Sequence, residues 1–112
     1  MDDRERRIGQ NEALFREVNE RVARLSDSMH ATTELTGFLC ECGTGSCHER
    51  VEMTLEEYER VRTEATRFAI VPGHEVADVE MVIAKYDRYW VIEKHEGEAA
   101  EFAEALDPRA GS

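Results

Sequence analysis

Residues 35–53 of the chain are LTGFLCECGTGSCHERVEM, two runs of strand-forming residues on either side of a Gly-Thr-Gly-Ser segment. Apolar residues such as Phe, Leu, Val and Met favour a half-buried strand, whereas neighbouring glycine and serine residues favour a turn. This pattern predicts a β-hairpin whose arms span residues 35–42 and 48–53. Because the turn brings the two arms side by side, the hairpin determines which side chains of this segment can meet.

All three cysteines of the chain lie in this hairpin, at positions 40, 42 and 47. Residues two apart on a strand point to the same face, so we expect Cys40 and Cys42 to project together. The glycines of the turn allow Cys47 to fold back onto that pair. Three thiolates that meet at one point are typical of a tetrahedral zinc site, and Zn²⁺ is the predicted cofactor. Two alternatives stay open: buried structural thiols, and a thiol redox pair formed by Cys42 and Cys47.

A fourth zinc ligand has to come from outside the cysteines. His74 follows a predicted strand and lies on a Pro-Gly turn, which suits it to face a neighbouring hairpin, and Glu75 could orient its ring. His48 is the alternative, although adjacent strand residues point to opposite faces, so Cys47 and His48 reach one ion only if the backbone is irregular. Three cysteines and one histidine close the coordination sphere, which indicates a structural metal site.

The rest of the chain predicts an α+β fold. We expect a long amphipathic N-terminal helix, followed by a small antiparallel β domain with the zinc-bearing hairpin and one or two short helices. Thr54 and Glu57 have the spacing of a capping box and predict the start of a second helix. On this basis the chain divides into an N-terminal helical arm (1–30), a zinc-stabilised domain (31–107) and a disordered tail (108–112).

Several later segments have strand or helix patterns. Residues 68–71 predict a short buried strand, and residues 79–85 and 89–94 predict two more strands rich in β-branched and aromatic residues. Residues 76–85 could instead form a helix, because Val76, Val79 and Ile83 also fit helical spacing. An Ala-rich stretch at 98–106 predicts the last helix.

The N-terminal segment, residues 6–29, places apolar side chains at the three- and four-residue steps of a coiled-coil seam. The predicted interface residues are Ile8, Asn11, Phe15, Val18, Val22 and Leu25, with Met29 at the end of the seam. Asn11 is the one polar member, and a buried Asn of this kind can fix the register of paired helices. Two interpretations stay open: the helix lies on its own domain, or it mediates a homodimer or docks a partner protein.

The composition excludes some partners. The chain has 112 residues, with 14 Lys and Arg against 25 Asp and Glu, and a formal net charge of −11. An acidic surface repels phosphate backbones, which disfavours nucleic-acid binding. No apolar run approaches the roughly 20 residues that cross a bilayer, and the charged N-terminus lacks the apolar segment of a secretory signal. We therefore expect a cytoplasmic protein that binds neither nucleic acid nor membrane.

Catalytic patterns are absent from the sequence. There is no phosphate-binding glycine loop, no His-Glu-x-x-His and no zinc-deaminase pattern. Cys47 and His48 are adjacent and should point to opposite faces, which disfavours a nucleophile–base pair. The favoured function is a non-enzymatic, zinc-stabilised protein-interaction module. The alternative is a metal- or thiol-dependent redox sensor, or a small metalloenzyme, that uses Cys40, Cys42 and Cys47.

Four segments are also familiar in combination: NEALFREVNER at 11–21, FLCECG at 38–43 with Cys47, TLEEY at 54–58 and PGHE at 72–75. Together they resemble a group of small, uncharacterised bacterial cytosolic proteins, over residues 11–94. The resemblance implies a bacterial cytosolic protein and no particular activity.

Overall fold

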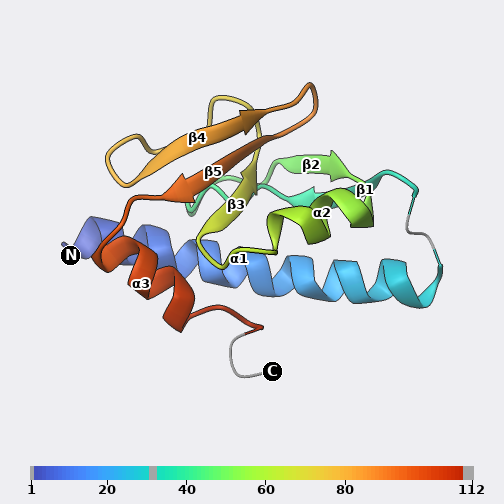
Figure 1. Cartoon of the computed structure of the whole chain (residues 1–112), viewed down its shortest axis with the longest axis horizontal. Helices are drawn as coiled ribbons and strands as arrows, with labels where there is room; N and C mark the ends of the chain where they lie inside the picture. Colours follow the sequence, from blue (N-terminus) through green and yellow to red (C-terminus); the bar gives the residue numbers. More distant parts are fainter. Residues whose placement is uncertain (1, 31–32, 110–112) are drawn as a thin grey trace.

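The structure, a computed structural model, describes residues 2–30 and 33–109, and the predicted α+β fold is confirmed (Figure 1). The boundary expected between helical arm and domain falls at residues 31–32, which lie outside the described residues. In chain order the elements are α1 (Asp3–Ser28), β1 (Thr36–Leu39), β2 (Arg50–Met53), α2 (Leu55–Val61), β3 (Arg67–Ile70), β4 (Glu80–Lys85), β5 (Trp90–Lys94) and α3 (Glu98–Ala105).

The strands form two small antiparallel sheets. The first is the predicted hairpin of β1 and β2, in which Phe38 pairs with Val51, although β1 ends at Leu39 and is shorter than expected. The second sheet has the order β3-β5-β4. Residues 80–85 form β4, so the strand interpretation of this segment is correct and the helical one is wrong.

The core lies between these sheets and the helices. The rings of Phe38 and Tyr58 stack with their centroids 4.5 Å apart, and Ile70 and Ile92 are fully buried beside them. Tyr58 is held there by α2, whose start has the predicted capping box. The Thr54 hydroxyl accepts a hydrogen bond from the Glu57 amide (3.1 Å), and the Glu57 carboxylate accepts one from the Thr54 amide (2.8 Å).

Helix α1 runs along the whole domain, with both sheets on one side of it and α3 beside its N-terminal half (Figure 1). Although α1 has 26 residues, neither it nor any other described helix is apolar enough to cross a membrane. Its side toward the domain is polar. The residues that it buries, here named the buried polar face, are Glu12, Arg16, Asn19, Glu20 and Ser26, together with Ala23.

Charges on the buried polar face meet partners from the sheets. Lys94 Nζ of β5 lies 2.7 Å from Glu12 Oε1 and 2.9 Å from Glu80 Oε1. Arg16 donates hydrogen bonds to the carbonyl oxygens of Ala65 and Arg67 and places its guanidinium 3.7 Å from the centre of the Phe68 ring. Such pairing offsets part of the cost of burying ionisable groups, since an unpaired buried charge is strongly destabilising.

The predicted seam of α1 lies beside this face. Phe15, Val18 and Val22 are half-buried, whereas Leu25 is largely exposed. The Asn11 amide donates a hydrogen bond to the carbonyl oxygen of Gly43, 3.0 Å away. Asn11 therefore has a partner within the chain, a role that the coiled-coil pattern does not predict.

The C-terminal segment is tied to the helices by arginines. Arg62 pairs with Glu20 and Asp107, and Arg109 pairs with Glu20 and Glu59. Within the expected disordered tail, which begins at Pro108, Arg109 therefore has ion-pair partners. The rest of that tail, residues 110–112, lies outside the described residues.

Candidate metal centre

Three separate segments contribute to a cluster of sulfur and nitrogen atoms. Cys40 and Cys42 follow β1, Cys47 precedes β2, and His74 follows β3 on the Pro-Gly turn. One potential ligand atom from each of the four lies within 4.8 Å of the others. The structure therefore brings together the four residues that the sequence analysis selects as preferred metal ligands.

The backbone of the cluster continues the hairpin beyond its regular strands. The Cys40 amide donates to the Glu49 carbonyl oxygen (3.0 Å), and the Glu41 amide donates to the Ala69 carbonyl oxygen of β3 (2.9 Å). The backbone hydrogen bonding thus continues through Glu41, whose side chain is directed to Asn19 and Tyr58 and away from the two flanking sulfurs. The expected alternation is preserved, although β1 itself ends one residue before Cys40.

Gly43 turns the chain after Cys42 and presses it against α1. Its φ angle is +79°, a conformation that residues with a Cβ rarely adopt. A Cβ at this position would lie 2.7 Å from Ile8 Cγ2, 2.9 Å from the Ile8 carbonyl oxygen and 2.9 Å from Glu12 Cγ. Both the turn and the close approach of α1 therefore require glycine here.

Backbone amides point at the sulfur atoms. The Val71 amide donates to Cys40 Sγ at 3.2 Å, and the amides of Thr44 and Glu49 donate to Cys42 and Cys47. A sulfur that accepts such bonds is stabilised as a thiolate, the form that ligates metals. The Cys40 thiol donates to Cys42, which lowers the pKa of Cys42, while that bond and burial raise the pKa of Cys40.

His74 is oriented by both of its ring nitrogens. Nδ1 lies 3.6 Å from Cys40 Sγ and 3.7 Å from Cys47 Sγ, whereas Nε2 lies 3.0 Å from Glu49 Oε2. A carboxylate on the outer nitrogen of a ligating histidine fixes the tautomer and makes the ligand nitrogen more basic. The residue in this role is Glu49, so the expectation that Glu75 orients the ring is wrong. His48, the alternative ligand, is exposed and stands outside the cluster.

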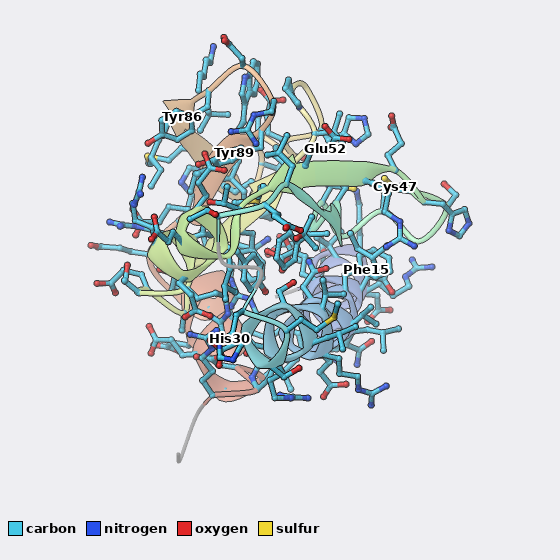
Figure 2. The ribbon with its side chains drawn as sticks, turned by 90° about the vertical axis from the view of Figure 1, so that its right-hand side faces the viewer. Phe15, His30, Cys47, Glu52, Tyr86 and Tyr89 are labelled. Atoms are coloured by element: carbon cyan, nitrogen blue, oxygen red, sulfur yellow. The ribbon has the colours of Figure 1, made fainter. Side chains whose placement is uncertain are left out.

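The cluster has a buried side and an open side. Cys40 and Cys42 are 2% and 1% exposed and belong to the hydrophobic core. Cys47 and His74 instead line a surface groove of about 430 Å³, together with His48, Glu49 and Glu75. Figure 2 shows Cys47 near the outer edge of the molecule, in the loop between β1 and β2. Solvent therefore reaches the cluster from the side of Cys47 and His74.

Glu41 is a site residue that sequence reasoning misses. Its carboxylate is fully buried behind the cluster and accepts hydrogen bonds from Asn19 Nδ2 (2.9 Å), the Tyr58 hydroxyl (3.1 Å) and the Ala69 amide (3.1 Å). The Asn19 side chain also donates a hydrogen bond to the Leu39 carbonyl oxygen and accepts one from the Leu39 amide, and so satisfies the end of β1. The only sequence signal is an acid between two cysteines in an otherwise apolar run.

The donor set fits a metal of the zinc type. Sulfur and imidazole nitrogen are the ligands that Zn²⁺ takes in structural sites, where four of them surround the ion tetrahedrally. The four donor atoms approach one another from three backbone segments, and all three cysteines are free of disulfide bonds. Comparisons of the chain with protein-family models, with curated proteins and with solved structures found no match. The geometry and chemistry of the site therefore carry the functional argument.

Proposed function

We propose that the chain is a non-enzymatic protein-interaction module stabilised by a zinc ion bound to Cys40, Cys42, Cys47 and His74. The observation that carries the proposal is the convergence of three sulfurs and one imidazole nitrogen within 4.8 Å. Zinc supplies four strong bonds that link the segments after β1, before β2 and after β3. Because an unfolded chain holds no such preformed site, the binding free energy adds to the free energy of unfolding.

The amide bonds to sulfur support zinc binding independently of the clustering. Val71, Thr44 and Glu49 direct their backbone N–H groups at the three sulfurs, and each such hydrogen bond lowers the pKa of its thiol against the raising effect of burial. Glu49 completes the arrangement on the far nitrogen of His74. Ordinary buried cysteines would need neither feature.

A closed ligand set argues for a structural role. Catalytic zinc keeps a position for water or substrate, whereas four protein ligands fill the tetrahedral sphere. Among the described residues, the groove beside the cluster offers no further cysteine, and the only other histidine in its lining is the exposed His48. The role in interaction is supported by the large apolar residues that α1 leaves in solvent, among them Leu14 and Leu25. Three free thiols suit a reducing compartment such as the cytoplasm.

Metal content tests the proposal directly. Untagged protein is purified without chelator, and its metals are measured by plasma mass spectrometry. We expect about one zinc ion per chain. The variant His74→Ala should lose most of that zinc, while the matched variant His48→Ala, a histidine in the same groove, should keep it. Metal-free wild-type protein, or equal zinc loss in both variants, would overturn the proposed site.

A second candidate function, a thiol-based redox sensor, is favoured by one observation. Cys47 is half-buried and lines the groove, so an oxidant reaches its sulfur more easily than those of Cys40 and Cys42. Labelling the native protein with a thiol reagent separates the two functions. Zinc-bound cysteines should react only after a chelator is added, whereas a sensor cysteine should react at once in the untreated protein.

A further inference from the structure

The outward side of α1 carries an apolar stripe that the described part of the chain leaves largely uncovered. Leu14, Leu25 and Met29 are 56%, 61% and 67% exposed, and Val18 lies between them. At 3.6 residues per turn these four positions fall within an arc of about 60°. The arc lies on the opposite side of the helix from the centre of the buried polar face. We call these four residues the outer stripe.

The spacing of the outer stripe is the same in both directions along the helix. Its steps are four, seven and four residues, from Leu14 to Val18, Leu25 and Met29. A two-fold axis between residues 21 and 22 would therefore place Leu14 opposite Met29 of a second copy, and Val18 opposite Leu25. An antiparallel pair of α1 helices buries all four residues of each chain by this single symmetric contact.

Charged residues on one flank of the outer stripe are complementary to those of an antiparallel second copy of α1. Glu17 and Arg24 lie on that flank, and neither has an ion-pair partner within the described part of the chain. In the antiparallel pair Glu17 faces Arg24 of the second copy, and the symmetry repeats this contact. A parallel pair would instead set the flank against Phe15 and Val22 and leave both charges without a partner. Charge complementarity therefore favours the antiparallel arrangement.

We propose that the outer stripe is the dimerisation surface of this protein and that its partner is a second, antiparallel copy of α1. The inference deepens the proposed interaction module and rests on it. It shifts the expected interface from the predicted seam of α1 toward the solvent-facing side of the same helix. Val18, Leu25 and Met29 are shared with the seam, Leu14 is added, the half-buried Phe15 and Val22 are left out, and Asn11 is excluded by its bond to Gly43.

The antiparallel pair has one unfavourable contact, which can be removed by substitution. Arg21 lies at the centre of the same flank, so the symmetry sets it beside Arg21 of the second copy. Like charges in this position repel. Removal of that charge should therefore strengthen the dimer, whereas a charge placed in the stripe should weaken it.

The experiment measures molar mass by light scattering and sedimentation across a wide concentration range, on the zinc-loaded full chain. We expect wild-type protein to approach twice the chain mass of 12.8 kDa as its concentration rises. Leu25→Lys should weaken dimerisation by more than about tenfold, and Arg21→Gln should strengthen it several-fold. Met81→Lys is the matched control, because Met81 is similarly exposed (51%) but lies on β4.

Each result bears on one proposal at a time. Zinc-loaded protein that stays monomeric at every concentration would overturn the dimer and leave the zinc module standing. A dimer that Leu25→Lys and Met81→Lys weaken equally would overturn the outer stripe as its surface, as would weaker association in Arg21→Gln. Dimeric protein that takes up no zinc would contradict the zinc module while supporting the stripe.

Discussion

The buried polar face of α1 and the cysteine cluster are both dense in groups that are costly to bury, and they differ in where those groups find partners. On the buried polar face, Glu12 meets Lys94 and Asn19 bonds Leu39 and Glu41, all within the chain. In the cluster, the sulfurs and His74 Nδ1 face mainly one another. Polar groups that the chain satisfies build structure, whereas converging donors of one chemical type indicate a ligand.

The largest effect is expected from removing one member of the cluster. Cys42→Ser should lower the free energy of unfolding by about 4 kcal/mol when free zinc is well above its dissociation constant, because the bound ion then stabilises only the wild type. In the presence of a strong chelator the two proteins should unfold almost together. Denaturant titrations under both conditions provide the test, and a difference that is the same with and without zinc would contradict it.

A substitution of Glu41, the carboxylate buried behind the cluster, should lower the free energy of unfolding whether or not zinc is present. Glu41→Ala leaves Asn19 Nδ2, the Tyr58 hydroxyl and the Ala69 amide without their buried acceptor, and should cost about 3 kcal/mol. The loss should be similar with zinc and with chelator, because these hydrogen bonds belong to the protein itself. Glu52→Ala, at an exposed position of β2, is the control. A loss seen only with zinc would show that Glu41 acts through the metal.

Gly43 follows Cys42 of the cluster and packs against Ile8 and Glu12 of α1, so substitutions there test the contact between the cluster and the helix. Gly43→Ala and Gly73→Ala both introduce a Cβ at positive φ, +79° and +90°. Only at Gly43 would that atom meet other atoms of the chain, since nothing lies within 4 Å of the site at Gly73. Thermal and denaturant unfolding should show Gly43→Ala less stable than Gly73→Ala by about 2 kcal/mol. Equal losses would show that α1 does not constrain the cysteine loop.

A further prediction concerns pH and the buried polar face, and its effect is spread over several pH units. Burial raises the pKa of Glu12 from 4.5 to about 8, against the opposing effect of Lys94. Between these values the folded chain binds a proton that the unfolded chain lacks, so this carboxyl's contribution to stability is complete below about pH 4.5 and is lost as the pH rises to about 8. The slope is at most about 1.4 kcal/mol per pH unit.

Glu12→Gln removes this titration. Unfolding free energies measured from pH 4.5 to 8 should show wild type losing its advantage over the variant as pH rises. Because both proteins keep the cysteine cluster, its own pH dependence cancels in the difference. Parallel curves would show that Glu12 is ionised in the folded protein throughout this range.

The hairpin, the capping box and the convergence of the three cysteines with His74 could be predicted because each depends on local chemistry. A glycine at position 43 indicates a turn, and Thr54 three residues before Glu57 indicates a helix start. The cysteines at 40, 42 and 47 can meet through one turn. The alternation of strand residues favours His74 over His48 as the histidine of the cluster. It does not reveal that Glu49 contacts the ring of His74.

The orientation of α1 could not be predicted in the same way. Helical periodicity locates an apolar stripe and assumes that this stripe faces the core. Here the partners of α1 are Lys94, Glu41 and Arg62, which lie far away in the sequence and make a polar side of the helix the buried one. A charge pattern along one helix cannot reveal those distant partners, and Leu25, a member of the predicted seam, is therefore exposed.

X-ray absorption at the zinc edge, on wild-type protein loaded with one equivalent of zinc, tests the metal centre most directly. We expect three sulfurs at about 2.3 Å and one nitrogen at about 2.0 Å around the ion. If Cys42→Ser still binds the ion, one of the three sulfurs should be replaced by a light atom. A shell of oxygen and nitrogen without sulfur, or sulfur in a number other than three in the wild type, would contradict the Cys₃His site.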